Sequence, residues 1–228
     1  MKVFVVSDLE GVAGIVKWQQ TDGAQEKQAY HEGRELYTQE INAAVRGAKA
    51  AGANEIVVMD CHGAGGEYDF NSLIPEKLDP DCEFVVQNEW TEYTELLEQG
   101  CDAALCGQWD CPVLLVTGDE AVCREGRDLL GDGLTTVAVK KGIGQFSARQ
   151  FPPLKARELI EEGAKRTLKD LSAVRPYDPG RPSEIQIEFH TPARLVEYRN
   201  RKGIEQLDAH TLVSRADDWW TAWAQFFF

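Results

Sequence analysis

The first half of the chain alternates short apolar runs with longer segments of helical periodicity. Residues 3–6, 56–59 and 84–86 are such apolar runs. Between the first two runs, apolar residues recur at helical spacing over residues 28–51, and Gly52 follows where a helix end requires a positive φ. This alternation is typical of βαβ units around a parallel sheet. It predicts an α/β fold, with a mostly parallel sheet and flanking helices.

The same pattern continues to about residue 174. We expect further strands at residues 103–106, 113–116 and 135–139. We expect helices at residues 91–99 and 120–130, and a last one from the Pro152-Pro153 pair to about residue 174.

A stretch with three prolines and one glycine, residues 175–182, marks a boundary near residue 176. Beyond it, Ile185, Ile187 and Phe189 alternate with polar residues, which predicts a strand with one exposed face. We therefore expect a larger α/β domain over residues 1–175. A smaller C-terminal α+β portion, residues 176–228, would pack on that domain or on a neighbouring subunit.

Composition narrows the class of protein. The 24 Lys+Arg against 38 Asp+Glu give a formal charge of -14, which repels phosphate backbones and anionic membranes. Neither nucleic acid nor a membrane is therefore expected as a partner. The N-terminal apolar run is too short for a signal peptide, so we expect a cytoplasmic protein. Its 6 cysteines form no CxxC pair and are expected as reduced thiols.

Polar side chains follow the first two predicted strands directly. The first strand continues into Asp8 and Glu10, and the second into Asp60-Cys61-His62. Asp8 and Glu10 are two residues apart, so in an extended chain their side chains point the same way. Because ligands bind beyond the carboxyl ends of parallel strands, His62 is expected to lie beside them.

Two carboxylates held together repel each other unless a cation lies between them. Carboxylate and imidazole together suit zinc, so Asp8, Glu10 and His62 are candidate metal ligands. The alternative is that Asp8 and Glu10 cap turn amides and that His62 satisfies a loop.

A second alternative uses Asp8 differently. Haloacid-dehalogenase-like phosphatases carry an Asp-x-Asp-Gly pattern after the first strand and a later Gly-Asp motif, and Gly118-Asp119 follows a strand here. The match is imperfect, because the third position is Glu10 and the candidate lysines follow Asp119. Asp119 is also explained as a helix N-cap.

The remaining polar and aromatic features have simpler explanations. His31, His190 and His210 are expected to be surface or structural residues. The Lys140-Lys141-Gly142 sequence could bind a carboxylate, but a solvated turn is favoured. Trp219 and Trp223 are four residues apart, which places them on one helix face.

Several segments resemble one known family. Residues 6–14 (VSDLEGVAG) and 57–63 (VVMDCHG) resemble the two signatures of the zinc D-aminopeptidase family. Residues 112–120, 138–140 and 216–218 also resemble that family's pattern, and the similarity runs from end to end.

The resemblance implies a hydrolase with two zinc ions per subunit that removes N-terminal D-amino acids from short peptides. It also implies a ring-shaped homo-oligomer, with a decamer as one possible size. Asp8 would bridge the two ions, Glu10 would bind one and His62 the other. A metal-bound water, with its pKa lowered, would be the nucleophile.

The sequence departs from the family at one place. The family pattern expects a Gly-Tyr-His-type motif, then a catalytic histidine and a glutamate ligand, all before residue 112. Here Cys106 continues into Gly107-Gln108-Trp109-Asp110. No catalytic residue and no organic-cofactor residue is therefore assigned.

Two hypotheses follow from this departure. The protein is either an active peptidase whose active-site segment lies outside this sequence, or a true deletion product that serves as a non-catalytic metal-binding oligomer. Parallel strands at 103–106 and 113–116 would be joined by only residues 107–112, whereas a parallel crossover needs about a dozen residues. We therefore favour the first hypothesis and predict a chain break near Cys106-Gly107.

Overall fold

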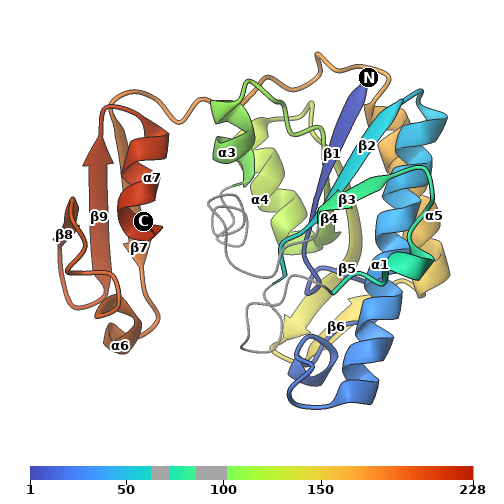
Figure 1. Cartoon of the computed structure of the whole chain (residues 1–228), viewed down its shortest axis with the longest axis horizontal. Coiled ribbons are helices and arrows are strands. Elements are labelled where there is room, and N and C mark those ends of the chain that lie inside the picture. Colours follow the sequence, from blue (N-terminus) through green and yellow to red (C-terminus); the bar gives the residue numbers. More distant parts are fainter. Residues whose placement is uncertain (63–71, 86–101, 228) are drawn as a thin grey trace. The chain divides into compact units, whose positions relative to one another are not determined.

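The computed structural model describes residues 1–62, 72–85 and 102–227 (Figure 1). The chain divides into two compact units. The first comprises Met1–Glu98 and Val113–Arg175, and the second comprises Gln99–Pro112 and Pro176–Phe228. The second unit thus joins Gln99–Pro112 to the C-terminal segment, and a domain boundary near residue 176 stays a prediction. Among the described residues, no helix is long and apolar enough to cross a membrane.

A parallel sheet forms the first part of the first unit. Its strands are β1 (Lys2–Ser7), β2 (Glu55–Asp60) and β3 (Glu83–Val85), in the order β1-β2-β3. The prediction of three parallel strands in these places is confirmed. Ser7 lies opposite Asp60, so β1 and β2 end at the same edge of the sheet.

Helix α1 (Lys27–Ala50) connects β1 to β2, after a short 3-10 helix η1 (Trp18–Gln20). Gly52 has a φ of 94°, as the sequence predicts for the end of this helix. A second short 3-10 helix, η2 (Pro75–Lys77), precedes β3. The helix expected at residues 91–99 lies outside the described residues.

A second sheet in the same unit consists of β4 (Leu115–Asp119), β5 (Thr135–Gly144) and β6 (Ser147–Gln150). The pair β4 and β5 is parallel, and β5 and β6 are antiparallel. Helix α4 (Glu120–Leu130) has the predicted bounds. Strand β5 is longer than predicted and carries Lys140 and Lys141, so the solvated turn expected there is wrong.

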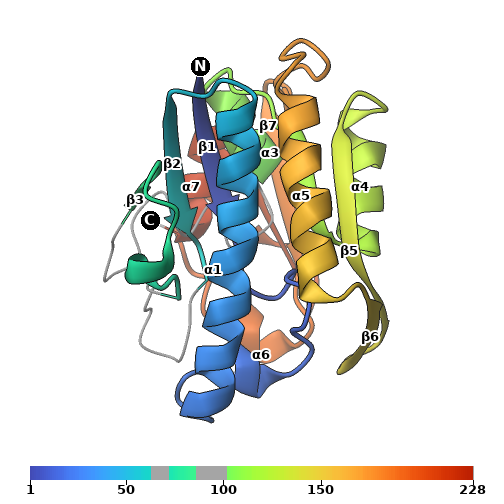
Figure 2. The same ribbon diagram turned by 90° about the vertical axis from the view of Figure 1, so that its right-hand side faces the viewer.

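Helices α1 and α5 (Pro153–Thr167) lie side by side against the sheets (Figure 2). Their close approach depends on Gly47, since a Cβ there would lie 2.3 Å from the Glu161 carbonyl oxygen. Helix α5 ends at Thr167 rather than near residue 174. The reason is local, because the Asp170 side chain accepts from the Ser172 backbone N–H and forms a turn instead.

The buried side chains of the first unit form its core. One cluster joins the loop after β1 to α1 and β2, and consists of Leu9, Val12, Ile15, Tyr37, Ile41, Val45, Ala48, Ile56, Val58 and Leu73. Leu9, Val12 and Ile15 belong to the loop that carries the candidate ligand Glu10. That loop is therefore packed into the core.

The second unit contains an antiparallel sheet of β7 (Ser183–Glu188), β9 (Thr211–Ala216) and β8 (Ile204–Gln206), in that order. It also contains α6 (Pro192–Leu195) and α7 (Trp219–Phe227). On α7, Trp219 and Trp223 stack with ring centroids 5.6 Å apart, which confirms their shared face. Phe226 is buried with Leu195 and Leu212 in the core of this unit.

Residues 103–106 do not form a strand. They belong to a helix, α3 (Asp102–Gln108), which contradicts the prediction. Alanine is the strongest helix former, and an apolar run this short does not distinguish strand from helix. Packing decides the outcome within the second unit, because Gly107 approaches Tyr177 so closely that a Cβ would lie 1.8 Å from the Tyr177 carbonyl oxygen.

The predicted chain break near Cys106 is also wrong. The chain is continuous after α3, with backbone hydrogen bonds from Trp109 N and Cys111 N to Cys106 O, at 3.1 and 2.9 Å. Asp110 has a φ of 55°, the left-handed conformation that commonly ends a helix. Because α3 is not a strand, residues 107–112 need not form a parallel crossover.

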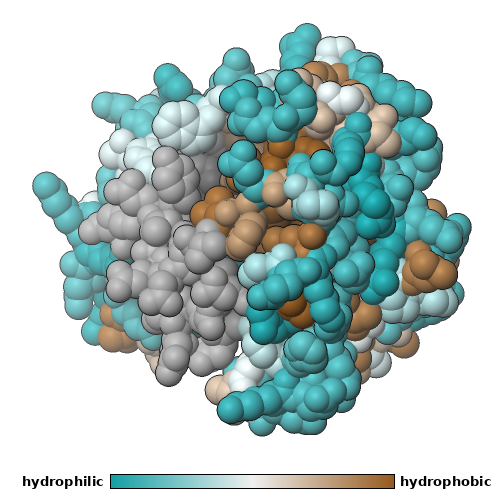
Figure 3. All heavy atoms as spheres, turned by 45° about the vertical axis from the view of Figure 1, so that its right-hand side comes forward, coloured by the Kyte–Doolittle hydropathy of each residue, from teal (hydrophilic) through white to brown (hydrophobic). Residues whose placement is uncertain are grey.

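The thiols of Cys82, Cys111 and Cys123 are free, as expected for reduced cysteines. Among the coloured residues in Figure 3, hydrophilic ones prevail, and hydrophobic ones gather near the middle of the view.

Candidate metal centre

Asp8, Glu10 and His62 meet at the carboxyl ends of β1 and β2. One ligand atom from each lies within 4.8 Å of the others, and no further group of three or more such residues forms in the described chain. Parallel pairing of Ser7 with Asp60 explains this convergence, because it brings the residues that follow both strands to one edge. The three residues are placed as predicted, and their role as ligands stays a prediction.

The His62 ring is held from both sides. Its Nδ1 lies 3.0 Å from Asp8 Oδ1 and 3.0 Å from Glu10 Oε2. Its Nε2 lies 2.7 Å from the backbone carbonyl oxygen of Thr21. A carbonyl only accepts, so Nε2 carries a proton. Nδ1 faces the two carboxylates, so it donates to them when the ring is protonated and offers its lone pair to a cation when the ring is neutral.

The three side chains change one another's pKa values. Burial opposes charge on His62, but hydrogen bonds to Asp8 and Glu10 outweigh it and raise the pKa of His62 to about 11. Partial desolvation also opposes charge on Asp8, yet the hydrogen bond with His62 lowers the pKa of that carboxyl. Partial desolvation, aided by the charge of Asp8, raises the pKa of Glu10. The pair of carboxylates thus favours a positive charge between them.

Asp60, at the end of β2, holds the backbone of His62, a role that was not predicted from the sequence. It is 1% exposed. Its Oδ1 accepts hydrogen bonds from the His62 backbone N–H at 3.1 Å and the Tyr37 hydroxyl at 3.0 Å. Its Oδ2 accepts from the Ser72 backbone N–H at 2.6 Å. A buried strand that ends in an aspartate was the available signal.

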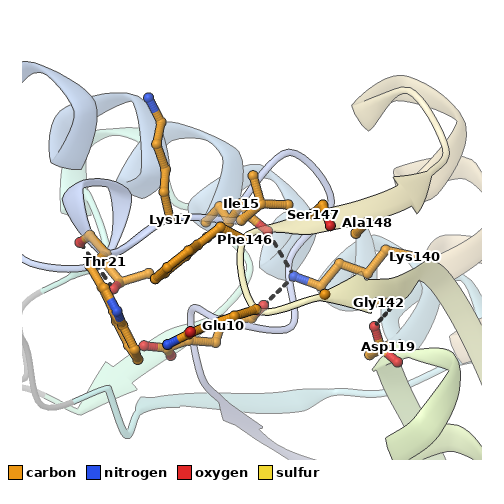
Figure 4. A pocket seen from close by; sticks show the side chains of 14 residues that line it. Glu10, Ile15, Lys17, Thr21, Asp119, Lys140, Gly142, Phe146, Ser147 and Ala148 are labelled. Carbon is orange, nitrogen blue, oxygen red and sulfur yellow. Dashed lines mark hydrogen bonds between the residues drawn. The ribbon is translucent and has the colours of Figure 1, made fainter.

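Lys140 holds the loop that carries Glu10. From β5, its Nζ donates to the backbone carbonyl oxygens of Glu10, of Val12 at 3.2 Å and of Ile15 at 2.9 Å. Figure 4 shows the contacts to Glu10 and Ile15 as dashed lines. These contacts cross 125 or more residues of sequence. Burial lowers the pKa of this ammonium group. Sequence periodicity carries no signal for such a contact.

Glu40 on α1 also contacts the loop after β1. Its side chain is buried, with the residue 6% exposed, and its Oε1 accepts from the Ala13 backbone N–H at 2.9 Å. Burial raises its pKa from 4.5 to about 7, against the opposing effects of this hydrogen bond and of nearby Arg157 and Lys140. In the folded state the carboxyl therefore keeps its proton to a higher pH than in the unfolded state. Ionising it in place costs folding free energy.

This raised pKa predicts a pH-dependent stability. The contribution of neutral Glu40 is complete below pH 4.5 and is lost as the pH rises through about 7. Glu40→Gln keeps the acceptor oxygen but cannot ionise. As the pH rises between these limits, the free energy of unfolding of the variant should therefore increase by about 2–3 kcal/mol relative to that of the wild type. Urea unfolding at pH 4.5 and 7.5 measures this. Glu32→Gln, exposed on the same helix, should show no such gain, and an equal gain would refute the assignment.

Among the described residues, the other singled-out side chains are not members of the group of three candidate ligands. His31 pairs with Glu35 on α1 at 3.4 Å. His190 and His210 belong to the second unit. Asp119 caps α4, since its Oδ1 accepts from the Ala121 backbone N–H at 2.8 Å, as the simpler explanation predicts.

A pocket of about 190 Å³ lies beside Glu10 in the first unit (Figure 4). It is bounded by the loop after β1, by η1, and by the turn between β5 and β6. Its walls include Glu10, Ile15, Val16, Lys17, Trp18, Thr21, Asp119, Lys140, Gly142, Phe146 and Ala148. Glu10 thus belongs both to the pocket and to the three candidate ligands.

The sequence model of the D-aminopeptidase family matches residues 1–102 and 83–228, two overlapping segments that together span the chain. The chain belongs to the D-aminopeptidase family. This membership sets aside the phosphatase alternative, in which Asp8 would have been the nucleophile.

Two relatives illustrate the D-aminopeptidase family. A D-aminopeptidase of Bacillus subtilis (strain 168) is 25% identical over an alignment of 231 positions, which covers 83% of this chain and 81% of that protein. The solved structure of the Zn-dependent D-aminopeptidase DppA from Bacillus subtilis, described as a self-compartmentalizing protease, superposes with a TM-score of 0.87. It covers 99% of this chain and 95% of that chain at 22% identity, which shows that the α/β fold is shared.

Proposed function

We propose that this protein is a zinc-dependent aminopeptidase that removes N-terminal D-amino acids from short peptides. One observation carries the proposal: Asp8, Glu10 and His62 bring three ligand atoms within 4.8 Å of one another, in a chain of the D-aminopeptidase family.

The donor set fits zinc. Two carboxylate oxygens and one imidazole nitrogen are ligands that zinc accepts, and three protein ligands leave a position open, as catalytic zinc sites do. The hydrogen bond from His62 Nε2 to Thr21 O leaves Nδ1 as the ligand atom and fixes the ring, which is the usual support for a metal-binding histidine. Bound zinc would supply Lewis acidity for a peptide carbonyl and a nucleophilic water near neutral pH.

The protein's own residues would contribute orientation. Asp60 and Thr21 hold His62, and Lys140 holds the backbone at Glu10. The carboxylates of Asp8 and Glu10 are 54% and 44% exposed, so a peptide can reach them. A second zinc ion, with Asp8 as the bridging ligand, would need ligands beyond these three.

The assembly is part of the proposal. The family neighbour is described as self-compartmentalizing, which supports a homo-oligomer for this chain, as the resemblance implied. A ring of ten subunits and a cytoplasmic location stay predictions.

The test combines metal and substrate. Purified protein should bind at least one zinc ion per chain in equilibrium dialysis, and the zinc-loaded protein should hydrolyse D-alanyl-D-alanine but not L-alanyl-L-alanine. Absence of zinc binding would contradict the proposal. Zinc binding without hydrolysis would instead support the alternative of a non-catalytic metal-binding oligomer.

A further inference from the structure

Two large aromatic side chains border the pocket beside Glu10 and remain half exposed. Trp18, from η1, and Phe146, from the turn between β5 and β6, are each 52% exposed. Their rings meet edge to face, with centroids 6.3 Å apart and an interplanar angle of 78°. Exposed aromatic area of this kind costs free energy in water and commonly marks a binding site.

The rest of the lining adds to this apolar character. Ile15 and Val16 from the loop after β1, and Ala148 from β6, add apolar surface, beside the polar Gln145 and Ser147. Gly142 and Gly144 contribute backbone without side chains, which keeps the space open. The volume of about 190 Å³ is smaller than the roughly 300–1,000 Å³ of sites for drug-sized ligands, so it suits one large side chain rather than a whole peptide.

Most charged groups of the lining are engaged elsewhere. Asp119 accepts from the backbone N–H groups of Ala121 and Gly142, at 2.8 and 2.7 Å. The Lys140 ammonium group donates hydrogen bonds to three backbone carbonyl oxygens. The Lys17 side chain points away from Glu10 and Lys140 (Figure 4). The pocket therefore offers mainly apolar contact to a ligand.

Glu10 connects this pocket to the candidate ligands. It lines the pocket, and its Oε2 lies 3.0 Å from His62 Nδ1. A peptide whose scissile carbonyl lies at Asp8, Glu10 and His62 therefore has this pocket within reach of an adjoining side chain. An aminopeptidase has a single residue on the N-terminal side of the scissile bond, which matches a pocket sized for one side chain.

We propose that this pocket binds the side chain of the substrate's N-terminal residue and selects a large apolar one, of the leucine or phenylalanine class, over alanine. The proposal rests on the function proposed above. The edge of the Trp18–Phe146 pair and the apolar walls would replace water around that side chain.

The experiment compares D-phenylalanyl and D-alanyl dipeptide amides with the zinc-loaded protein. The wild type should show a kcat/KM at least about tenfold higher for the D-phenylalanyl substrate. Ala148→Leu, which fills the pocket, and Phe146→Ala, which removes one wall, should each lower that ratio about tenfold while zinc content stays unchanged. Phe146→Leu should restore most of the ratio. Ile143→Ala is the matched control, because Ile143 is 72% exposed on β5 and does not line the pocket.

A second readout does not depend on turnover. Binding of free D-phenylalanine and D-alanine, measured by calorimetry without zinc, should favour D-phenylalanine in the wild type and lose that preference in Ala148→Leu. Equal preference in the wild type and in both pocket variants would overturn the inference, while zinc binding and D-alanyl hydrolysis would leave the proposed function standing. If the wild type neither binds zinc nor hydrolyses any of the peptides, the proposed function is refuted. The calorimetric binding of the free amino acids would still test whether the pocket prefers a large apolar side chain.

Discussion

Asp8→Asn is expected to lower zinc affinity by about 100-fold or more and to abolish hydrolysis of D-alanyl peptides. The amide is nearly the same size as the carboxylate but carries no charge, so it neither offsets the metal charge nor competes as a ligand. The Asp8 side chain is 54% exposed, so the metal-free fold should survive the change. Competition with a chromophoric chelator measures the affinity.

Thermal unfolding provides the folding control. At 100 times its Kd, zinc should stabilise the wild type by about 2.7 kcal/mol, and Asp8→Asn should lose this gain while its metal-free Tm stays near that of the wild type. Asp132→Asn, at an exposed position outside the three candidate ligands, should keep it. A zinc-dependent Tm shift of equal size in Asp8→Asn would show that Asp8 is not a ligand.

Asp8→Asn also tests whether the site binds one zinc ion or two. If Asp8 bridges two zinc ions, Asp8→Asn should lose both, whereas Glu10→Gln should lose one. With a single ion, both substitutions weaken the same site. Zinc content after dialysis, measured by atomic absorption, distinguishes these outcomes.

Lys140→Met should destabilise the protein by about 2–4 kcal/mol and weaken zinc binding by about 10- to 100-fold. Methionine has a similar length but no donor, so the carbonyl groups of Glu10, Val12 and Ile15 lose the ammonium group that they share. The loop could then shift Glu10 away from His62. Urea unfolding gives the stability, and chelator competition on the folded variant gives the zinc affinity.

The neighbouring lysine is the matched control. Lys141 on the same strand forms a half-exposed ion pair with Glu120, and such pairs contribute only about 0–1 kcal/mol. Lys141→Met should therefore leave zinc affinity unchanged. If Lys140→Met keeps the zinc affinity of the wild type, the lysine stabilises the fold without positioning Glu10. Lys140→Arg, which keeps a donor, should recover part of the stability and part of the zinc affinity.

Where sequence reasoning failed, the local signal was weak or the deciding contact was distant. Residues 103–106 are apolar but rich in alanine, so strand and helix were equally compatible with the run, and α3 forms where Gly107 packs on Tyr177. The error about a chain break followed from that single misassignment. Helix α5 ended early because Asp170 forms a turn that apolar spacing does not reveal.

The sequence by itself determined the βαβ order of β1, α1 and β2, and with it the placement of Asp8, Glu10 and His62. Buried parallel strands and their connecting helix have strong periodic signals, and register then brings the residues that follow the strands to one edge. Only the tertiary structure decided how these ligands are supported. Lys140, Thr21 and the aromatic pair of Trp18 and Phe146 reach the site through contacts between segments far apart in the chain. Such contacts depend on packing, which leaves no periodic pattern in the sequence.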